Sequence, residues 1–147
     1  MPPTTNATAG SAAPNPDELL VAGARELGIH LGATEVSAFR AYREEIFRWS
    51  ERMNLTALTA PVEVVRQGFL DSLACAALFP PDTGRVLDIG SGAGFPAIPL
   101  AVTKPGIEFT LVEPSRKKAT FLRHIARRLK LTGIRVRPGR AEMFLRD

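Results

Sequence analysis

The sequence predicts an α/β fold, in which a parallel β-sheet follows a region of helices. In residues 16–82, apolar side chains recur at helical intervals of three or four positions. Residues 83–147 instead alternate short β-type runs with amphipathic helical stretches, and a cluster of glycines follows the first of these runs. The order strand, helix, strand, helix, strand is typical of a doubly wound parallel sheet.

The region 16–82 is expected to hold three helices. The first covers about 16–28, because an Asn-Pro pair supplies a cap and a first-turn proline, and a glycine ends it. The third extends over about 61–78. The second begins near Thr34, and we expect its aromatic residues to be core residues rather than platforms for stacking bases. Its apolar stripe consists of Val36, Phe39, Tyr42, Ile46, Trp49 and Met53.

The region 83–147 is expected to be the first part of an α/β domain. Strands are predicted at 85–89, 107–112 and 134–136, and a helix at 115–131 precedes the last of them. The chain ends before any strand that could cover the edge of this sheet. We therefore expect an incomplete sheet.

Composition excludes several classes of protein. Residues 1–15 carry no charged side chain and no apolar run, which indicates a disordered tail rather than a secretory signal. No later stretch approaches the roughly 18 apolar residues of a membrane span. Cys75 is the only cysteine, and neither histidine has partners at metal-ligand spacing, so we expect no disulfide and no metal. The formal net charge of +4 favours a polyanionic partner. A single cysteine fits the reducing cytoplasm, and we expect the full-length protein to be a monomer.

The segment from Asp88 to Phe95, DIGSGAGF, is predicted to be a ligand-binding loop. Gly90, Gly92 and Gly94 allow a tight turn and let a ligand approach the backbone. A nucleoside triphosphate requires Lys and Ser or Thr after the last glycine, and a dinucleotide requires glycine where Phe95 stands. Asp88 would also repel a pyrophosphate. The loop therefore argues against both of these ligands.

S-adenosylmethionine fits the loop better, because it carries ammonium and sulfonium groups and no phosphate. Asp88 can serve the ammonium group, and loop N–H groups can meet the ligand carboxylate. Glu113 ends the second strand, 25 residues after Asp88, where an acidic side chain can accept hydrogen bonds from both ribose hydroxyls. A tight turn flanked by two solvated carboxylates is the alternative interpretation.

Four segments resemble a known family, the ribosomal RNA small subunit methyltransferase G proteins, also called glucose-inhibited division protein B. The resemblance extends from about Leu19 to the end of the chain. The most specific segment is the third, because two prolines after the glycines are unusual among methyltransferases. The segments are WSERMNLTA at 49–57, FLDSL at 69–73, DIGSGAGFPAIPL at 88–100 and RAE at 140–142.

The resemblance implies a Rossmann-like, S-adenosylmethionine-dependent methyltransferase fold and methyl transfer to N7 of a guanine in 16S ribosomal RNA. It implies cofactor contacts at Gly90 and Phe95, and at Ala141 and Glu142 beside the adenine. Guanine N7 has a free lone pair, so no general base is needed and no catalytic residue is assigned. The expected cofactor-binding residues are Asp88, Gly90, Gly92, Gly94, Phe95, Glu113, Ala141 and Glu142.

The sequence departs from the family pattern in two places. Family members usually carry a His directly before the Phe-Leu-Asp-Ser element, where this sequence has Gly68. They also continue through further strands, so we expect a fragment or a truncated gene product. Two function hypotheses stay open: an RNA methyltransferase, and a non-catalytic remnant that binds cofactor or RNA.

Residues 116–130 contain seven basic side chains and no acidic one. A solvated helix face is the usual meaning of such a run, but its one-sidedness also favours contact with an RNA backbone. The expected partner is 16S ribosomal RNA or the small ribosomal subunit. The candidate RNA-binding residues are Lys117, Lys118, Arg123 and Arg127, and His124 lies alongside them.

Overall fold

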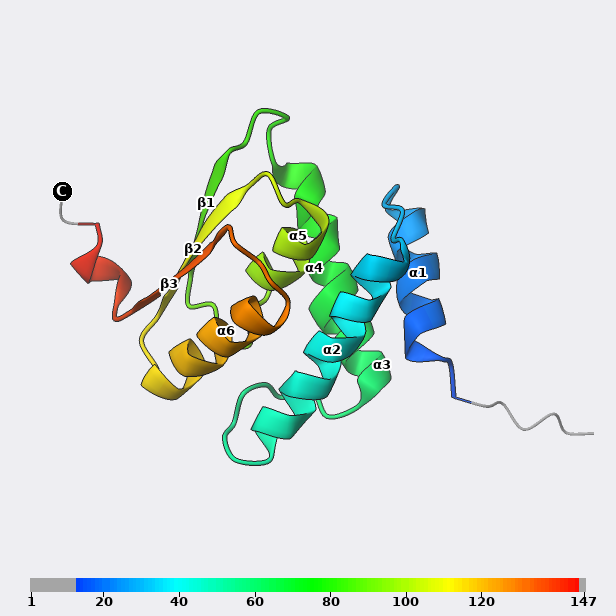
Figure 1. The fold of residues 1–147 in the computed structure, drawn as a ribbon, viewed down its shortest axis with the longest axis horizontal. Coiled ribbons are helices and arrows are strands. Elements are labelled where there is room, and N and C mark those ends of the chain that lie inside the picture. Colours follow the sequence, from blue (N-terminus) through cyan, green and yellow to red (C-terminus); the bar gives the residue numbers. More distant parts are fainter. Residues whose placement is uncertain (1–12, 146–147) are drawn as a thin grey trace, which may run out of the picture.

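The computed structural model describes residues 13–145, so most of the tail expected at 1–15 lies outside the described residues. Figure 1 shows the sheet at one side of the molecule, with α1 and α2 at the other. In chain order the elements are α1 (Pro16–Glu26), α2 (Ala33–Ser50), α3 (Pro61–Glu63), η1 (Val64–Leu70), α4 (Asp71–Ala74), η2 (Cys75–Leu78), β1 (Arg85–Ile89), α5 (Ala97–Thr103), β2 (Glu108–Glu113), α6 (Arg116–Arg128), β3 (Ile134–Pro138) and η3 (Ala141–Met143).

The first two helices begin where the sequence predicts. The Asn15 side chain accepts hydrogen bonds from the N–H groups of Asp17 and Glu18, at 2.9 and 3.2 Å, and so caps α1. The Asp17 carboxylate then pairs with Arg40 at 2.7 Å and with Arg43 at 3.0 Å, both on α2. Burial alone would raise the pKa of the Asp17 carboxyl, but the hydrogen bonds and charges of these two arginines together outweigh burial and lower the pKa. The two helices are thereby joined at their surface.

The predicted helix at 61–78 is helical throughout, but it is not one regular α-helix. Its middle part, η1, is a π-helix, and its end, η2, is a 3₁₀-helix. Gly68 lies within η1, and the Ser72 hydroxyl donates a hydrogen bond to the Gly68 carbonyl. A π-helical turn holds an extra residue and so changes the direction of the side chains that follow it.

The three strands form one parallel sheet in the order β1-β2-β3. Asp88 pairs with Leu111, and Leu111 pairs with Val136. The strand at 85–89 is confirmed, whereas β2 and β3 end slightly later than predicted. Because all three strands run the same way, their carboxyl ends meet at one edge.

Helices cover one face of this sheet. Both crossovers step in the same direction along the sheet, so right-handed connections place α5 and α6 on the same face. Phe109 and Leu111 are buried under these helices. On the opposite face Leu87 and Ile89 are 49% and 52% exposed. A doubly wound sheet carries helices on both faces. Within residues 13–145, helices cover only the face of Phe109 and Leu111, so this expectation is met on that face alone (Figure 1).

The helical region and the sheet share one hydrophobic core. Phe39 and Tyr42 of α2 belong to it, as do Phe69 of η1, Phe109 of β2 and Phe121 of α6. The prediction that the aromatic residues of α2 are core residues is confirmed for Phe39 and Tyr42, which are fully buried. This common core fixes the position of the helices relative to the glycine loop.

Candidate cofactor site

The three segments expected to bind a cofactor begin at the same edge of the sheet. The glycine loop follows β1, Glu113 ends β2, and η3 follows β3. The Gly90 N–H donates to the Val112 carbonyl at 2.8 Å, and the Gly139 N–H donates to the Glu113 carbonyl at 3.0 Å. Ligands of open α/β sheets bind at the carboxyl ends of the strands, which is where these segments lie.

Glu113 is a buried clamp at the centre of this edge. Glu113 is only 5% exposed. One carboxylate oxygen accepts a hydrogen bond from the Gly92 N–H at 2.8 Å, and the other accepts from the Ser115 N–H at 3.2 Å. Glu113 therefore ties the glycine loop to β2 and to the start of α6. Each oxygen keeps further acceptor capacity toward a ligand.

The N–H groups of the loop bond within the protein. Those of Gly90 and Ser91 donate to the Val112 carbonyl, that of Gly94 donates to the Ser91 carbonyl, and that of Gly92 donates to Glu113. We expected loop N–H groups to meet a ligand carboxylate. The structure instead gives these four groups acceptors at the end of β2 and in the loop itself.

The three loop glycines have different roles. Gly90 and Gly92 have φ angles of +74° and +56°, and a Cβ atom on either would meet nothing within 4 Å. They therefore form the turn and leave open space beside it. A Cβ on Gly94 would instead lie 2.6 Å from the Tyr42 hydroxyl oxygen and from a side-chain carbon of Ile98. Gly94 is needed for packing.

Asp88 carries a carboxylate oxygen without a partner. Its Oδ2 atom is buried and has no hydrogen-bond partner among residues 13–145. Burial raises the pKa of the Asp88 carboxyl above its usual value of 3.8, and the charge of Glu113 adds to this shift, while hydrogen bonds from Ser91 and Ala97 oppose it. A buried unpaired carboxylate oxygen is costly. A ligand ammonium group, meeting this oxygen directly or through a water molecule, would supply the donor that it lacks.

Phe95 points toward the helices and packs in an aromatic cluster. Its ring centroid lies 5.9 Å from that of Tyr42 and 6.1 Å from that of Phe69. The Tyr42 hydroxyl donates a hydrogen bond of 2.5 Å to the Ala93 carbonyl. Burial raises the pKa of Tyr42 well above its usual value, with the charge of Asp88 as a second cause. The sequence identified Tyr42 as a core residue but gave no sign that it holds the loop.

Gly68 makes room for the Phe95 ring. A Cβ atom at position 68 would lie 2.6 Å from Cζ of Phe95 and 3.0 Å from its nearest ring neighbour. Gly68 itself is buried in η1. The space that a longer side chain at position 68 would need is thus taken by an aromatic ring from the glycine loop.

Replacing Gly68 with Ala is expected to lower the free energy of unfolding by about 1–2 kcal/mol. The added methyl group overpacks the cluster at a cost of up to about 3 kcal/mol, and the better helix propensity of Ala offsets about 1 kcal/mol of that cost. Urea unfolding measures this. The control is Gly84→Ala, since a Cβ there meets nothing within 4 Å; we expect a change within about 0.5 kcal/mol. The cost of Gly68→Ala should shrink in a Phe95→Leu background. A Gly68→Ala protein as stable as its parent would contradict this packing.

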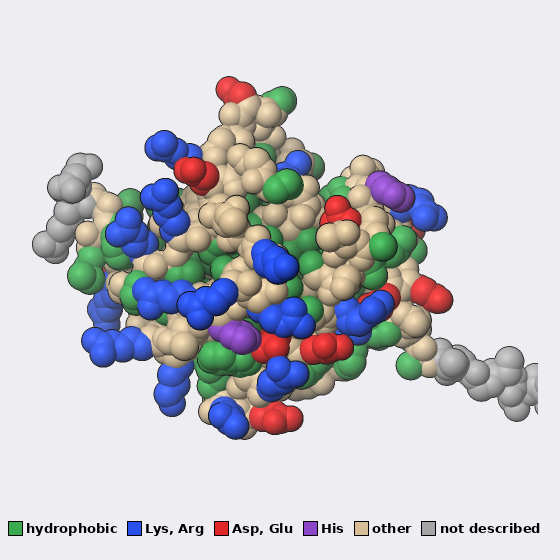
Figure 2. Space-filling view, viewed as in Figure 1, with side chains coloured by type: hydrophobic (Ala, Val, Ile, Leu, Met, Phe, Trp, Pro, Cys, Tyr) green, Lys and Arg blue, Asp and Glu red, His purple; other side chains and the backbone are tan. Residues whose placement is uncertain are grey.

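The basic residues do not form one uniform face. Figure 2 shows Lys and Arg side chains gathered over α6 and at the end of α2 beside it. Lys117, Arg123 and Arg127 are exposed, whereas Lys118 is partly buried in the first turn of α6. His124 is engaged elsewhere, because its Nε2 atom lies 2.8 Å from a carboxylate oxygen of Glu45 on α2.

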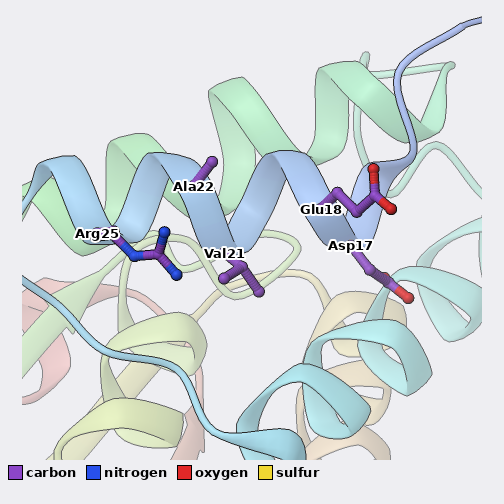
Figure 3. Close-up of a pocket in the computed structure, with 5 residues that line it drawn as sticks. All are labelled: Asp17, Glu18, Val21, Ala22 and Arg25. Carbon is purple, nitrogen blue, oxygen red and sulfur yellow. The ribbon is translucent and has the colours of Figure 1, made fainter.

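A hollow on α1 lies apart from the cofactor edge. Figure 3 shows the five side chains that line it, all from α1, and its volume is about 320 Å³. The Asp17 carboxylate there is already paired with two arginines of α2. We assign no ligand to this hollow. Its lining consists of Asp17, Glu18, Val21, Ala22 and Arg25.

Comparison with known proteins identifies the family of this chain. The model of the GidB family, described as rRNA small subunit methyltransferase G, matches residues 35–147. The chain belongs to this family. A relative named "Ribosomal RNA small subunit methyltransferase G" from Roseiflexus castenholzii is 44% identical over 131 residues, which cover 89% of this chain and 56% of the relative.

Other GidB-family relatives give the same result. The protein of that name from Caldanaerobacter subterraneus subsp. tengcongensis is 45% identical over 126 residues, covering 85% of this chain and 53% of the relative. That from Geotalea uraniireducens is 44% identical over 114 residues, covering 78% and 52%. The chain thus spans about half the length of the curated relatives it matches.

Two further findings concern the described part of this GidB-family chain. No helix within residues 13–145 is both long and apolar enough to cross a membrane. In the same part of the chain, no three His, Cys, Asp or Glu side chains gather as a metal site would require. The thiol of Cys75 is free, and its sulfur lies 3.5 Å from the Asp71 carbonyl oxygen.

Proposed function

We propose that this chain carries the cofactor-binding part of an enzyme that methylates N7 of a guanine in 16S ribosomal RNA, with S-adenosylmethionine as methyl donor. The observation that carries the proposal is the unpartnered, buried Oδ2 atom of Asp88 beside the open turn at Gly90 and Gly92. The RNA substrate is suggested by the name of the relatives, which refers to ribosomal RNA of the small subunit.

Each residue of the edge has a proposed role. Asp88 accepts a hydrogen bond from the ammonium group of the cofactor. Glu113 accepts hydrogen bonds from the ribose of the cofactor and also holds the glycine loop in place. Gly90 and Gly92 leave room for the ligand, and Gly94 and Phe95 keep the loop in place. Ala141 and Glu142 of η3 flank the adenine.

Methyl transfer to guanine N7 requires little proton transfer by the protein. The cofactor supplies an electrophilic methyl group, and guanine N7 supplies a lone pair without a proton to remove. The protein therefore contributes orientation and exclusion of water. We propose that Lys117, Lys118, Arg123 and Arg127 contact the RNA backbone, and that the enzyme acts in the cytoplasm as a monomer.

Isothermal titration calorimetry tests the cofactor assignment. S-adenosylhomocysteine, the demethylated product, is expected to bind at least about tenfold more tightly than NAD, because Asp88 attracts an ammonium group and repels a pyrophosphate. Both titrations are made at equal ionic strength. Equal or tighter binding of NAD would exclude S-adenosylmethionine as the cofactor.

A further inference from the structure

A second hollow lies between the end of α2 and the first half of α6. Its volume is about 540 Å³. Trp49 and Met53 provide its apolar lining, and Arg48, Arg52 and Lys117 provide positive charge. Lys117 lies four positions after Glu113, so this hollow adjoins the same edge of the sheet as the cofactor site.

Trp49 is held in a fixed orientation at this hollow. Its ring meets Phe121 edge-on at a centroid distance of 5.5 Å, and it lies 5.1 Å from the ring of His124. Its indole N–H donates to a carboxylate oxygen of Glu45 at 3.2 Å. Trp49 is only partly buried, so part of the ring remains available to a ligand. The expectation that Trp49 is a core residue therefore describes only one side of the ring.

Glu45 holds the Trp49 ring and its neighbours in place. It is 5% exposed, and its carboxylate binds the Trp49 indole, the Arg48 guanidinium at 2.8 Å and the His124 ring at 2.8 Å. A buried carboxylate with three partners orients all of them. Arg48 is thereby partly neutralised, which leaves Arg52 and Lys117 as the cations most available to a ligand.

The charge and the aromatic lining of the hollow favour a nucleotide. Glu51 is the acidic side chain in the lining, against three basic ones. An aromatic face next to cations is the usual arrangement for binding single-stranded nucleic acid, because the ring stacks on a base while the cations meet phosphates. An acidic protein segment would meet the cations but would leave the aromatic ring without a planar partner.

We infer that this hollow binds one nucleotide of single-stranded RNA, with the base against Trp49 and the adjoining phosphates against Arg52 and Lys117. The inference rests on the proposed function, which supplies the RNA substrate. To Lys117, already proposed as an RNA contact, it adds Trp49 of α2 and Arg52 just after α2, which lie outside the run of basic residues on α6. The hollow would hold the RNA beside the cofactor edge while a guanine is presented there.

Trp49 is the only tryptophan of the chain, so its fluorescence reports directly on the hollow. Titration with a short, purine-rich single-stranded RNA is expected to quench this fluorescence. The double variant Arg52→Gln, Lys117→Gln should weaken binding at least about tenfold and reduce the salt slope by about 1.4, or about 0.7 per lost phosphate contact. The control, Arg128→Gln with Arg135→Gln, removes the same charge elsewhere and should weaken binding less than about threefold.

Three results would overturn the inference. These are RNA binding without quenching, equal weakening by the two double variants, and displacement of RNA by polyglutamate at the same charge concentration. Circular dichroism of each variant verifies that it is folded. Calorimetry with S-adenosylhomocysteine distinguishes the two proposals, because failure of cofactor binding with intact quenching would contradict the cofactor site and leave the RNA hollow supported.

Discussion

Replacing Glu113 with Gln is expected to lower the free energy of unfolding by about 2–4 kcal/mol. The carboxylate is buried and accepts hydrogen bonds from the Gly92 and Ser115 N–H groups. A Gln side chain keeps one oxygen acceptor, but its NH₂ group faces the other donor, which is then buried without a partner. Loss of the clamp frees the loop, so affinity for S-adenosylhomocysteine should fall at least about tenfold.

Glu108 provides a matched control for this substitution. It opens the same strand that Glu113 closes, is exposed, and forms only a 3.7 Å ion pair with Arg85. Glu108→Gln should change the free energy of unfolding by less than about 0.5 kcal/mol. Urea unfolding and calorimetry measure both variants. If the two substitutions cost the same, Glu113 is not a clamp.

Replacing Asp88 with Asn should separate cofactor binding from stability. The variant loses a charged acceptor, so affinity for S-adenosylhomocysteine should fall by a factor on the order of a hundred. The fold should be at least as stable at neutral pH, because the buried charge is gone. Calorimetry and thermal unfolding test the two effects. A destabilised variant that retains its affinity would show that Asp88 is structural.

The pH dependence of stability follows from the direction of the Asp88 shift. The folded-state pKa of Asp88 is raised above 3.8, so ionisation of this group disfavours the folded state. The neutral Asp88 carboxyl therefore contributes stability below its unfolded-state pKa, and the parent protein should lose that stability as pH rises through the folded-state pKa. Asp88→Asn removes that loss, so the stability difference between variant and parent should grow over this range. Cofactor affinity of the parent should weaken in the opposite direction, as pH falls.

The sequence predicted the sheet edge well, because local patterns determine it. A short apolar run followed by glycines indicated β1, and parallel strands bring Asp88 and Glu113 to one edge whatever the loops do. The sequence did not reveal that Glu113 accepts hydrogen bonds from backbone N–H groups of the protein, at Gly92 in the glycine loop and at Ser115. Its acidic character is the same whether it binds protein or ligand.

Other features depend on contacts between distant segments. Spacing of three to four residues does not distinguish a π-helix from an α-helix, so the sequence indicates a helix at 61–78 but not its type. The direction of Phe95 depends on the missing side chain at Gly68, which lies in another element. The engagement of His124 depends on Glu45, 79 positions earlier. Such pairings are not visible in any local pattern.

The aromatic cluster makes the glycine loop and the helices one cooperative unit. Tyr42 of α2 holds the Ala93 carbonyl, and Phe95 fills the space above Gly68 of η1. The loop therefore cannot open far without unpacking the two helical elements behind it. Opening events of that size cost much more than the fraying of an ordinary surface loop. The backbone amides of the loop are thus protected from exchange with solvent by the stability of the helical region, and not by the loop alone.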